Sequence, residues 1–204
     1  MFDAALRPHK EALLAPVARR VAERVAPGWL TLGGIILGVG AAVAAGGGLR
    51  WLSLVLWMVS RVLDGLDGIV ARHRGAAGDL GGYLDMIADA VVYAAVPIGV
   101  AAAAGGCAWI SGMVLIGAFY VNALAWAYLA AVVEKHGAGT SRDGLTSIVM
   151  PAGLVEGAET LVLYTLMLAV PSRATVWFIL MTVLVAMTTV QRVWWASRTL
   201  RTQS

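Results

Sequence analysis

Two pairs of aspartates lie within some of the most apolar sequence of this 204-residue chain. Asp64 and Asp67 are three residues apart, and Asp85 and Asp89 are four residues apart. On a helix, both spacings place the two carboxylates of a pair on one face. A carboxylate at bilayer depth costs roughly 3 kcal/mol or more unless it is paired, solvated or bound to a ligand. We therefore expect two helices that direct their carboxylates towards one divalent cation or a pair of cations.

The four aspartates offer only carboxylate oxygens as ligands. Mg²⁺ and Mn²⁺ prefer oxygen ligands, whereas a zinc site needs a set of histidines or cysteines. His9, His73 and His136 lie apart in polar segments, where we expect surface or interface residues. Cys107 is the single cysteine, so no intramolecular disulfide can form. We expect it to act as a small apolar residue near the start of a helix. The sequence therefore predicts Mg²⁺ or Mn²⁺ as the cofactor.

The composition places these helices in a bilayer. The chain is 60% hydrophobic and 13% charged, which is about half the charged share of a typical soluble domain. No polar linker or run of charges divides it, so we expect one domain over residues 1–204. We expect the protein to be embedded in a lipid bilayer and to have no nucleic-acid partner.

Apolar runs separated by glycine, proline or polar intervals predict about six membrane-spanning helices between residues 27 and 197. The expected spans are residues 29–45, 51–74, 80–104, 108–133, 148–170 and 176–195. Residues 1–25 carry apolar residues at helical spacing among charges. This pattern predicts an amphipathic helix on the membrane surface, with a solvated tail as the alternative. The expected fold is an all-α, polytopic membrane protein with an N-terminal interfacial helix.

Basic residues predict the orientation of the spans, because cytoplasmic loops carry an excess of lysine and arginine. One side of the bundle would hold most of them, namely Arg7, Lys10, Arg19, Arg20, Arg24, Arg72, Arg74, Lys135, Arg142, Arg192, Arg198 and Arg201. The other side would hold Arg50 and Arg173. Both termini and the four aspartates are therefore expected at the cytoplasmic face of a cell inner membrane.

The aspartates are part of a longer pattern, D-x2-D-G-x2-A-R-x8-G-x3-D-x3-D, between Asp64 and Asp89. Every fixed position and every gap of this pattern resembles the signature of the CDP-alcohol phosphatidyltransferase family. Pro27 and the Leu30-Thr31 pair also resemble the family's usual start of the first span. Gly28 departs from the family, which commonly has a polar residue there, often asparagine. This departure concerns a contact to the nucleotide and leaves the metal site untouched.

The resemblance implies a membrane enzyme of phospholipid synthesis. Two metal ions on the four aspartates would bind the pyrophosphate of a CDP-linked lipid, expected to be CDP-diacylglycerol. The hydroxyl of a small polar alcohol would attack the lipid phosphorus, Asp89 would take its proton, and CMP would leave. The residues expected at the nucleotide are Asp64, Asp67, Gly68, Ala71, Arg72 and Gly81. The family also implies a homodimer.

Three charged residues are candidates for binding the acceptor alcohol, namely Glu156, Glu159 and Arg142. Relatives that use phosphorylated acceptors tend to have arginines near this place, so the two glutamates favour an acceptor without a phosphate. Arg142 keeps a phosphorylated acceptor open, and pairing of the glutamates with basic residues is the alternative. Arg61, just before the signature, is expected to pair with a carboxylate or reach the interface, with a substrate contact as the alternative.

Two other functions are compatible with acids inside a membrane. The first is a divalent-cation transporter, whose ion path should continue as polar residues across the bilayer. Residues 54–57 and 96–100, in the outer halves of the two signature helices, are almost wholly apolar. The second is an inactive scaffold that keeps the fold, against which the intact signature argues. We therefore expect an enzyme.

Overall fold

The computed structural model describes residues 15–18, 20–76, 78–135 and 153–200. Over these residues the chain is helical and forms no strand. The helices after residue 26 are α2 (Pro27–Gly46), α3 (Arg50–His73), α4 (Asp79–Ala104), α5 (Cys107–Lys135), α6 (Gly157–Ala169), the short 3-10 helix η1 (Pro171–Arg173) and α7 (Ala174–Thr199). Residues 15–18 and 20–22 are helical ahead of α2. The predicted all-α class is confirmed.

Four helical segments of the described chain are long and apolar enough to cross a membrane, namely α2, α4, α5 and the stretch Pro171–Thr199. Helix α3 has 24 residues but carries Arg61, Asp64 and Asp67 within it. Helix α6 has 13 residues and is about 20 Å long, which is less than the roughly 30 Å of a bilayer core. The predicted start of that span, residues 148–152, lies outside the described residues. The protein is an integral membrane protein, and the number of six spans stays a prediction.

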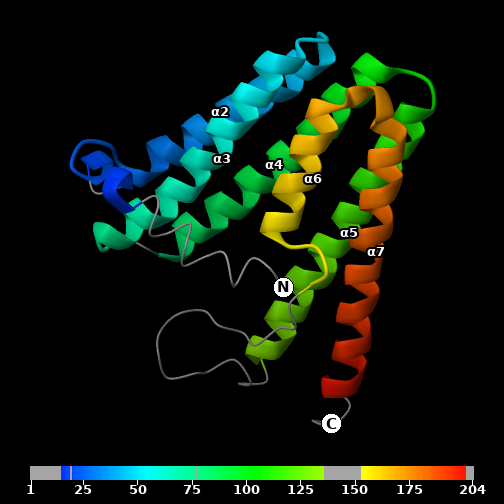
Figure 1. Cartoon of the computed structure of the whole chain (residues 1–204). Coiled ribbons are helices and arrows are strands. Elements are labelled where there is room, and N and C mark those ends of the chain that lie inside the picture. Colours follow the sequence, from blue (N-terminus) through cyan, green and yellow to red (C-terminus); the bar gives the residue numbers. More distant parts are fainter. Residues whose placement is uncertain (1–14, 19, 77, 136–152, 201–204) are drawn as a thin grey trace.

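The helices form two groups with α6 between them (Figure 1). The first, which we call the α2–α4 group, consists of α2, α3 and α4, and the second, the α5–α7 group, consists of α5 and α7. Helix α2 packs closely against both α3 and α4, and α5 packs against α7. Helices α3 and α4 make few contacts with each other, although a short connection joins His73 to Asp79. The two helices that carry the signature are therefore held in place by α2 rather than by direct packing on one another.

Small residues allow α2 to approach its neighbours closely. A Cβ added at Gly99 of α4 would overlap the backbone of Ala42, and one added at Gly38 would lie 2.6 Å from a methyl carbon of Val92. On the α3 side, the hydroxyl of Ser60 donates a hydrogen bond of 2.8 Å to the carbonyl oxygen of Gly34. In lipid, close packing and hydrogen bonds between helices replace the hydrophobic effect as the source of association. The α2–α4 group is therefore tightly assembled.

The helical residues ahead of α2 pack on the end of the bundle where α3 ends. Ala18 is fully buried in a cluster with Leu30, Leu66 and Val70. Arg74 donates a hydrogen bond of 2.5 Å from Nε to the carbonyl oxygen of Ala22. Within the range predicted for the N-terminal helix, residues 15–18 and 20–22 are thus helical and pack on α2 and α3, and the position of this helix at the membrane surface stays a prediction. Residues 1–14 of that prediction lie outside the described chain.

Candidate active site

The signature residues lie at one end of the bundle, because α3 and α4 run in opposite directions from their short connection. Asp64 and Asp67 are in the second half of α3, and Asp85 and Asp89 are in the first half of α4. The fold thus places all four predicted carboxylates at what we call the signature end. Their immediate surroundings differ from one aspartate to the next.

Arg61 connects the two signature helices. Its Nη1 donates a hydrogen bond of 2.6 Å to Oδ1 of Asp89 and lies 3.7 Å from Oδ2 of Asp64. Its Nη2 donates to the hydroxyl oxygen of Ser60 at 3.2 Å. Only 7% of the Arg61 side chain is exposed. The predicted pairing of Arg61 with a carboxylate is confirmed, and its guanidinium lies between an acid of α3 and an acid of α4.

Aromatic rings close the site on the side away from the connection. The guanidinium carbon of Arg61 lies 5.0 Å from the ring centroid of Trp57 and 5.4 Å from that of Tyr93. Trp57 stacks on Tyr164 with centroids 5.3 Å apart, and both side chains are fully buried. Phe119 completes this aromatic layer at 6.4 Å from Tyr93. The layer gives the arginine cation–π contacts and separates the acids from the apolar core beyond.

Asp67 has a different partner, on α2. It is 6% exposed, and its Oδ2 accepts a hydrogen bond of 2.7 Å from the hydroxyl of Thr31. A buried carboxylate needs such a partner because leaving it unsatisfied is costly. The sequence pattern around Pro27 and Thr31 indicated the start of a span, but it did not predict this contact across 36 residues.

Carboxylate oxygens are the ligands that a hard divalent cation prefers, so the donor set suits such an ion in its chemistry. Asp64 and Asp89 keep 24% and 35% of their side chains exposed, so a cation could reach them from the signature end. Among the described residues, no three acidic, histidine or cysteine side chains lie close enough together to hold a metal ion. The positive charge between Asp64 and Asp89 is the guanidinium of Arg61. The residues fit Mg²⁺ or Mn²⁺, and binding one requires the carboxylates to draw closer together.

The residues predicted at the nucleotide lie at the same end. A Cβ at Gly81 would meet nothing within 4 Å, so the space beside it is open, whereas one at Gly68 would lie 3.5 Å from Nη1 of Arg72. Ala71 is half-buried, one turn after Asp67. A hollow of about 260 Å³ at this end is lined by Ala15, Ile69, Arg72 and His73. Arg72 therefore lines an open hollow at the signature end, and none of the four aspartates is part of its lining.

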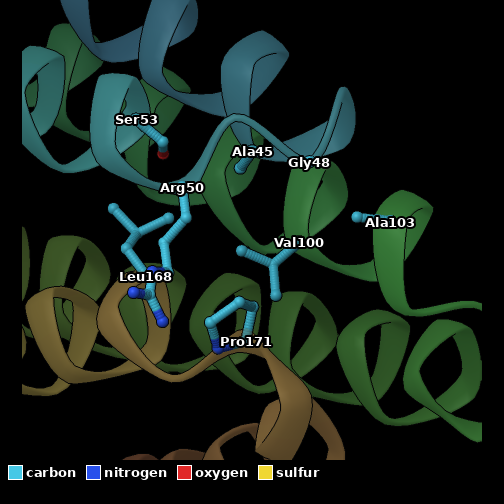
Figure 2. Close-up of a pocket in the computed structure, with 8 residues that line it drawn as sticks. All are labelled: Ala45, Gly48, Arg50, Ser53, Val100, Ala103, Leu168 and Pro171. Atoms are coloured by element: carbon cyan, nitrogen blue, oxygen red, sulfur yellow. The ribbon is translucent and has the colours of Figure 1, made fainter.

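Another hollow lies at the opposite end of the bundle and contains no signature residue. Figure 2 shows Arg50 extending from α3 towards Leu168 and Pro171 in this hollow. Its volume is about 50 Å³, enough for one or two water molecules. Nη1 of Arg50 lies 3.4 Å from the carbonyl oxygen of Ala169. The small size and mainly apolar lining separate this hollow from the candidate site.

A further set of polar side chains lies between α5, α7 and the start of α6. Nη1 of Arg192 donates a hydrogen bond of 2.7 Å to Oδ1 of Asn122, and the hydroxyl of Thr189 lies 3.2 Å from the same oxygen. The N–H of Val155 donates to the hydroxyl of Thr188 at 3.2 Å. We call Asn122, Thr188, Thr189 and Arg192 the α7 polar cluster. The sequence indicated Arg192 only as one basic residue of the cytoplasmic side, because Asn122 is 70 positions away.

Glu156 and Glu159 form a capping box at the start of α6. The N–H of Glu156 donates to Oε2 of Glu159 at 3.1 Å, and Oε1 of Glu156 accepts from the N–H of Gly153 at 3.0 Å. A capping box satisfies backbone groups that the first helical turn leaves without partners. The role of both glutamates at an acceptor stays a prediction. Arg142, the third predicted acceptor residue, lies outside the described residues.

Comparison with known proteins identifies the family. The family model of CDP-alcohol phosphatidyltransferase matches residues 24–190. The chain belongs to the CDP-alcohol phosphatidyltransferase family. It is also 34% identical over 202 residues to the inner membrane protein YnjF of Escherichia coli (strain K12), an alignment that covers 98% of each chain. The resemblance inferred from the signature is thus confirmed.

Solved structures share the fold of this family member. The phosphatidylinositol phosphate synthase PgsA1 of Mycobacterium tuberculosis, in complex with manganese and citrate, is similar with a TM-score of 0.68 and 23% identity, covering 87% of this chain and 86% of that chain. The same synthase with CDP-DAG bound gives a TM-score of 0.66 at 22% identity, covering 87% and 90%. At such identities the likeness establishes the fold, and what PgsA1 binds is a property of PgsA1.

Proposed function

We propose that this protein transfers the phosphatidyl group of CDP-diacylglycerol to the hydroxyl of a small polar alcohol and releases CMP. The observation that carries the proposal is the position of Asp64 and Asp89, which lie on either side of one guanidinium and remain reachable from the signature end. Membership of the family supports transfer from a CDP-linked lipid. The CDP-DAG complex of PgsA1 supports the choice of donor.

Asp64, Asp67, Asp85 and Asp89 would hold two ions of Mg²⁺ or Mn²⁺, a proposal that the manganese complex of PgsA1 supports. Bound ions would stabilise charge on the attacking and leaving oxygens. The open side of Gly81 supports close approach of the nucleotide there. Gly68, Ala71 and Arg72 would contact the rest of the CMP moiety, with the Arg72 guanidinium as a donor to phosphate oxygens.

The chain's own residues then account for the displacement. Asp89 takes the proton of the acceptor hydroxyl, the hydroxyl oxygen forms a bond to the lipid phosphorus, and the bond from phosphorus to CMP breaks. The aromatic layer around Trp57 and Tyr93 bounds the site on its inner side. The lipid tails stay in the bilayer while the headgroup is held at the signature end.

The remaining parts of the proposal concern the acceptor and the setting. Glu156, Glu159 and Arg142 are proposed on the acceptor side, where the glutamates would bind hydroxyl groups. The signature end is proposed to face the cytoplasm with both termini, since the basic residues gather on that side. Residues 1–204 would act as one domain within a homodimer.

The test is release of CMP from CDP-diacylglycerol by the purified protein with Mg²⁺ or Mn²⁺ and a panel of alcohols. We expect CMP with at least one alcohol, none after chelation of the metal, and at least a hundredfold less from Asp89→Asn. Lipid mass spectrometry of the product identifies the acceptor. A folded, metal-binding protein that forms no CMP with any alcohol of the panel would contradict the proposal.

The cation-transporter alternative makes a different prediction. An ion path would have to pass the aromatic layer, where Trp57 and Tyr164 are fully buried, and then the buried apolar residues Val96 and Val100. This packing favours the enzyme. Metal flux into protein-containing liposomes, in the absence of CMP release, would support transport instead.

A further inference from the structure

We propose that Arg61 is a built-in counter-cation of the acidic site, which stabilises the metal-free carboxylates and lowers the affinity of the site for divalent cations. The inference rests on the proposed function in one respect, which is that the signature aspartates bind metal. Arg61 is not part of the family signature that this chain matches, and a role in the site follows from its contacts.

The first observation is the burial of Arg61, whereas the other arginines among the described residues lie near helix ends or are partly exposed. Its side chain is 7% exposed, and its Nε is buried without a hydrogen-bond partner among the described groups. A buried charge is costly unless a strong partner compensates it. The compensation comes from Asp89 at 2.6 Å and Asp64 at 3.7 Å. The position of Arg61 is therefore tied to the acids rather than to packing alone.

The second observation is that Arg61 is held in place from several sides. The Ser60 hydroxyl accepts from its Nη2, and the rings of Trp57 and Tyr93 lie 5.0 and 5.4 Å from its guanidinium carbon. Ser60 itself donates to the backbone of α2. The charge is thus fixed at the site and cannot move far when a second cation arrives.

The third observation is where this contact lies in the fold. Helices α3 and α4 pack on α2 and make few contacts with each other, so the ion pair of Arg61 with Asp89 is one of the links that join them at this level. Without a cation there, the carboxylates of the two helices would repel one another in surroundings of low dielectric constant. In the metal-free protein, Arg61 supplies that positive charge.

A fixed positive charge beside metal ligands has a second effect. It repels an incoming divalent cation, and its hydrogen bond competes with the metal for one oxygen of Asp89. Removal of the charge should therefore lower the thermal stability of the metal-free protein and raise the affinity of the site for metal. A purely structural arginine would change stability without changing the affinity for metal.

The experiment compares the full-length wild type with Arg61→Gln, Arg61→Lys and Arg50→Gln in detergent after removal of metal with a chelator. Arg50 is a matched control, because it lies on the same helix, its guanidinium carbon is 4.4 Å from the ring centroid of Trp51, and its Nη1 contacts a backbone carbonyl oxygen rather than a carboxylate. Two quantities are measured, the midpoint of a Mn²⁺ titration by calorimetry and the thermal unfolding midpoint with and without Mn²⁺.

We expect Arg61→Gln to reach half-saturation at a Mn²⁺ concentration at least fivefold lower than the wild type. Its unfolding midpoint should fall without metal, and Mn²⁺ should restore most of the loss. Arg61→Lys keeps the charge, so its titration midpoint should stay within about twofold of the wild type, as should that of Arg50→Gln. If Arg61→Gln folds only in the presence of Mn²⁺, the inference is supported in the same sense.

Several results would overturn the inference. They are an unchanged or weaker Mn²⁺ affinity of Arg61→Gln, an equal loss of thermal stability with and without Mn²⁺, failure of that variant to fold even with Mn²⁺, or an Arg61→Lys midpoint that shifts as far as that of Arg61→Gln. A wild type that shows no response to Mn²⁺ would instead contradict the metal site of the proposed function. A wild type that binds Mn²⁺ but releases no CMP would contradict the reaction and leave the role of Arg61 standing.

Discussion

Arg61 in the α2–α4 group and Arg192 in the α5–α7 group are both arginines within apolar helices, but their partners differ. The guanidinium of Arg61 lies between two carboxylates, whereas Nη1 of Arg192 donates to the neutral side chain of Asn122. Glu156 lies close enough to Arg192 to interact with it electrostatically. The first group is organised around balancing an excess of negative charge, and the second around satisfying one positive charge.

The two groups also differ in how their helices pack. The α2–α4 contact depends on glycines, so that backbone lies against backbone at Gly99 and Ala42. Between the other helices, larger side chains such as Leu115 and Phe178 are fully buried. The helices that carry the signature are thus set at fixed positions by contacts that leave no room for an added methyl group.

The largest expected effect tests this difference in packing. Gly99→Ala should destabilise the protein by about 3 kcal/mol, because its Cβ would overlap the backbone of Ala42 and force α2 and α4 apart. Gly117→Ala on α5 is the control, since its Cβ would meet nothing within 4 Å. Alanine favours a helix over glycine by up to about 1 kcal/mol, so this variant should not be destabilised. Thermal unfolding in detergent measures both. Equal behaviour of the two variants would show that the glycine contact is not what holds the α2–α4 group.

The next effect separates the two arginines. Asn122→Leu should cost about 2 kcal/mol, because it removes the acceptor that lies 2.7 Å from Nη1 of Arg192. The midpoint of the Mn²⁺ titration should stay at the wild-type value, since Asn122 belongs to the α7 polar cluster and not to the acids. A changed Mn²⁺ midpoint would mean that the α7 polar cluster and the acidic site are coupled, so that the two arginines do not act independently.

A smaller effect is expected at the link from α2 to the acids. Thr31→Val keeps the shape of the side chain but removes the hydroxyl that donates to Asp67. It should therefore lower the free energy of unfolding by about 1.5 kcal/mol and shift the midpoint of the Mn²⁺ titration. Thr182→Val is the matched control, because the Thr182 hydroxyl donates to the carbonyl oxygen of Phe178 on its own helix. Calorimetric Mn²⁺ titration of both variants makes the comparison. An identical response from the two would exclude a role of Thr31 in the site.

The smallest effect distinguishes the two roles considered for Glu159. Glu159→Gln retains an oxygen for the N–H of Glu156 and should leave stability nearly unchanged, whereas Glu159→Ala should cost about 1 kcal/mol through loss of the cap. If Glu159 also binds the acceptor through its charge, Glu159→Gln should raise the KM for the alcohol. A KM equal to that of the wild type would leave capping as the role of this residue.

Much of the local structure could be predicted from the sequence. The signature helices were expected at residues 51–74 and 80–104 and are found at Arg50–His73 and Asp79–Ala104, because glycine and polar residues interrupt the apolar runs there. The spacing of the aspartates predicted that each pair shares one face of its helix, and the fold adds that both pairs lie at the same end, because α3 and α4 run in opposite directions. The pairing of Arg61 with a carboxylate also followed, since a charge in such a segment needs a partner.

What the sequence could not determine is which helix lies opposite each polar residue. Periodicity assigns a residue to a face of its own helix, but the rotation and neighbours of that helix depend on packing between segments far apart in the chain. For this reason the contacts of Thr31 with Asp67 and of Asn122 with Arg192, and the position of α2 against both signature helices, came only from the tertiary structure. The sequence determined that the acids needed a positive charge, and the fold decided that Arg61 lies between them.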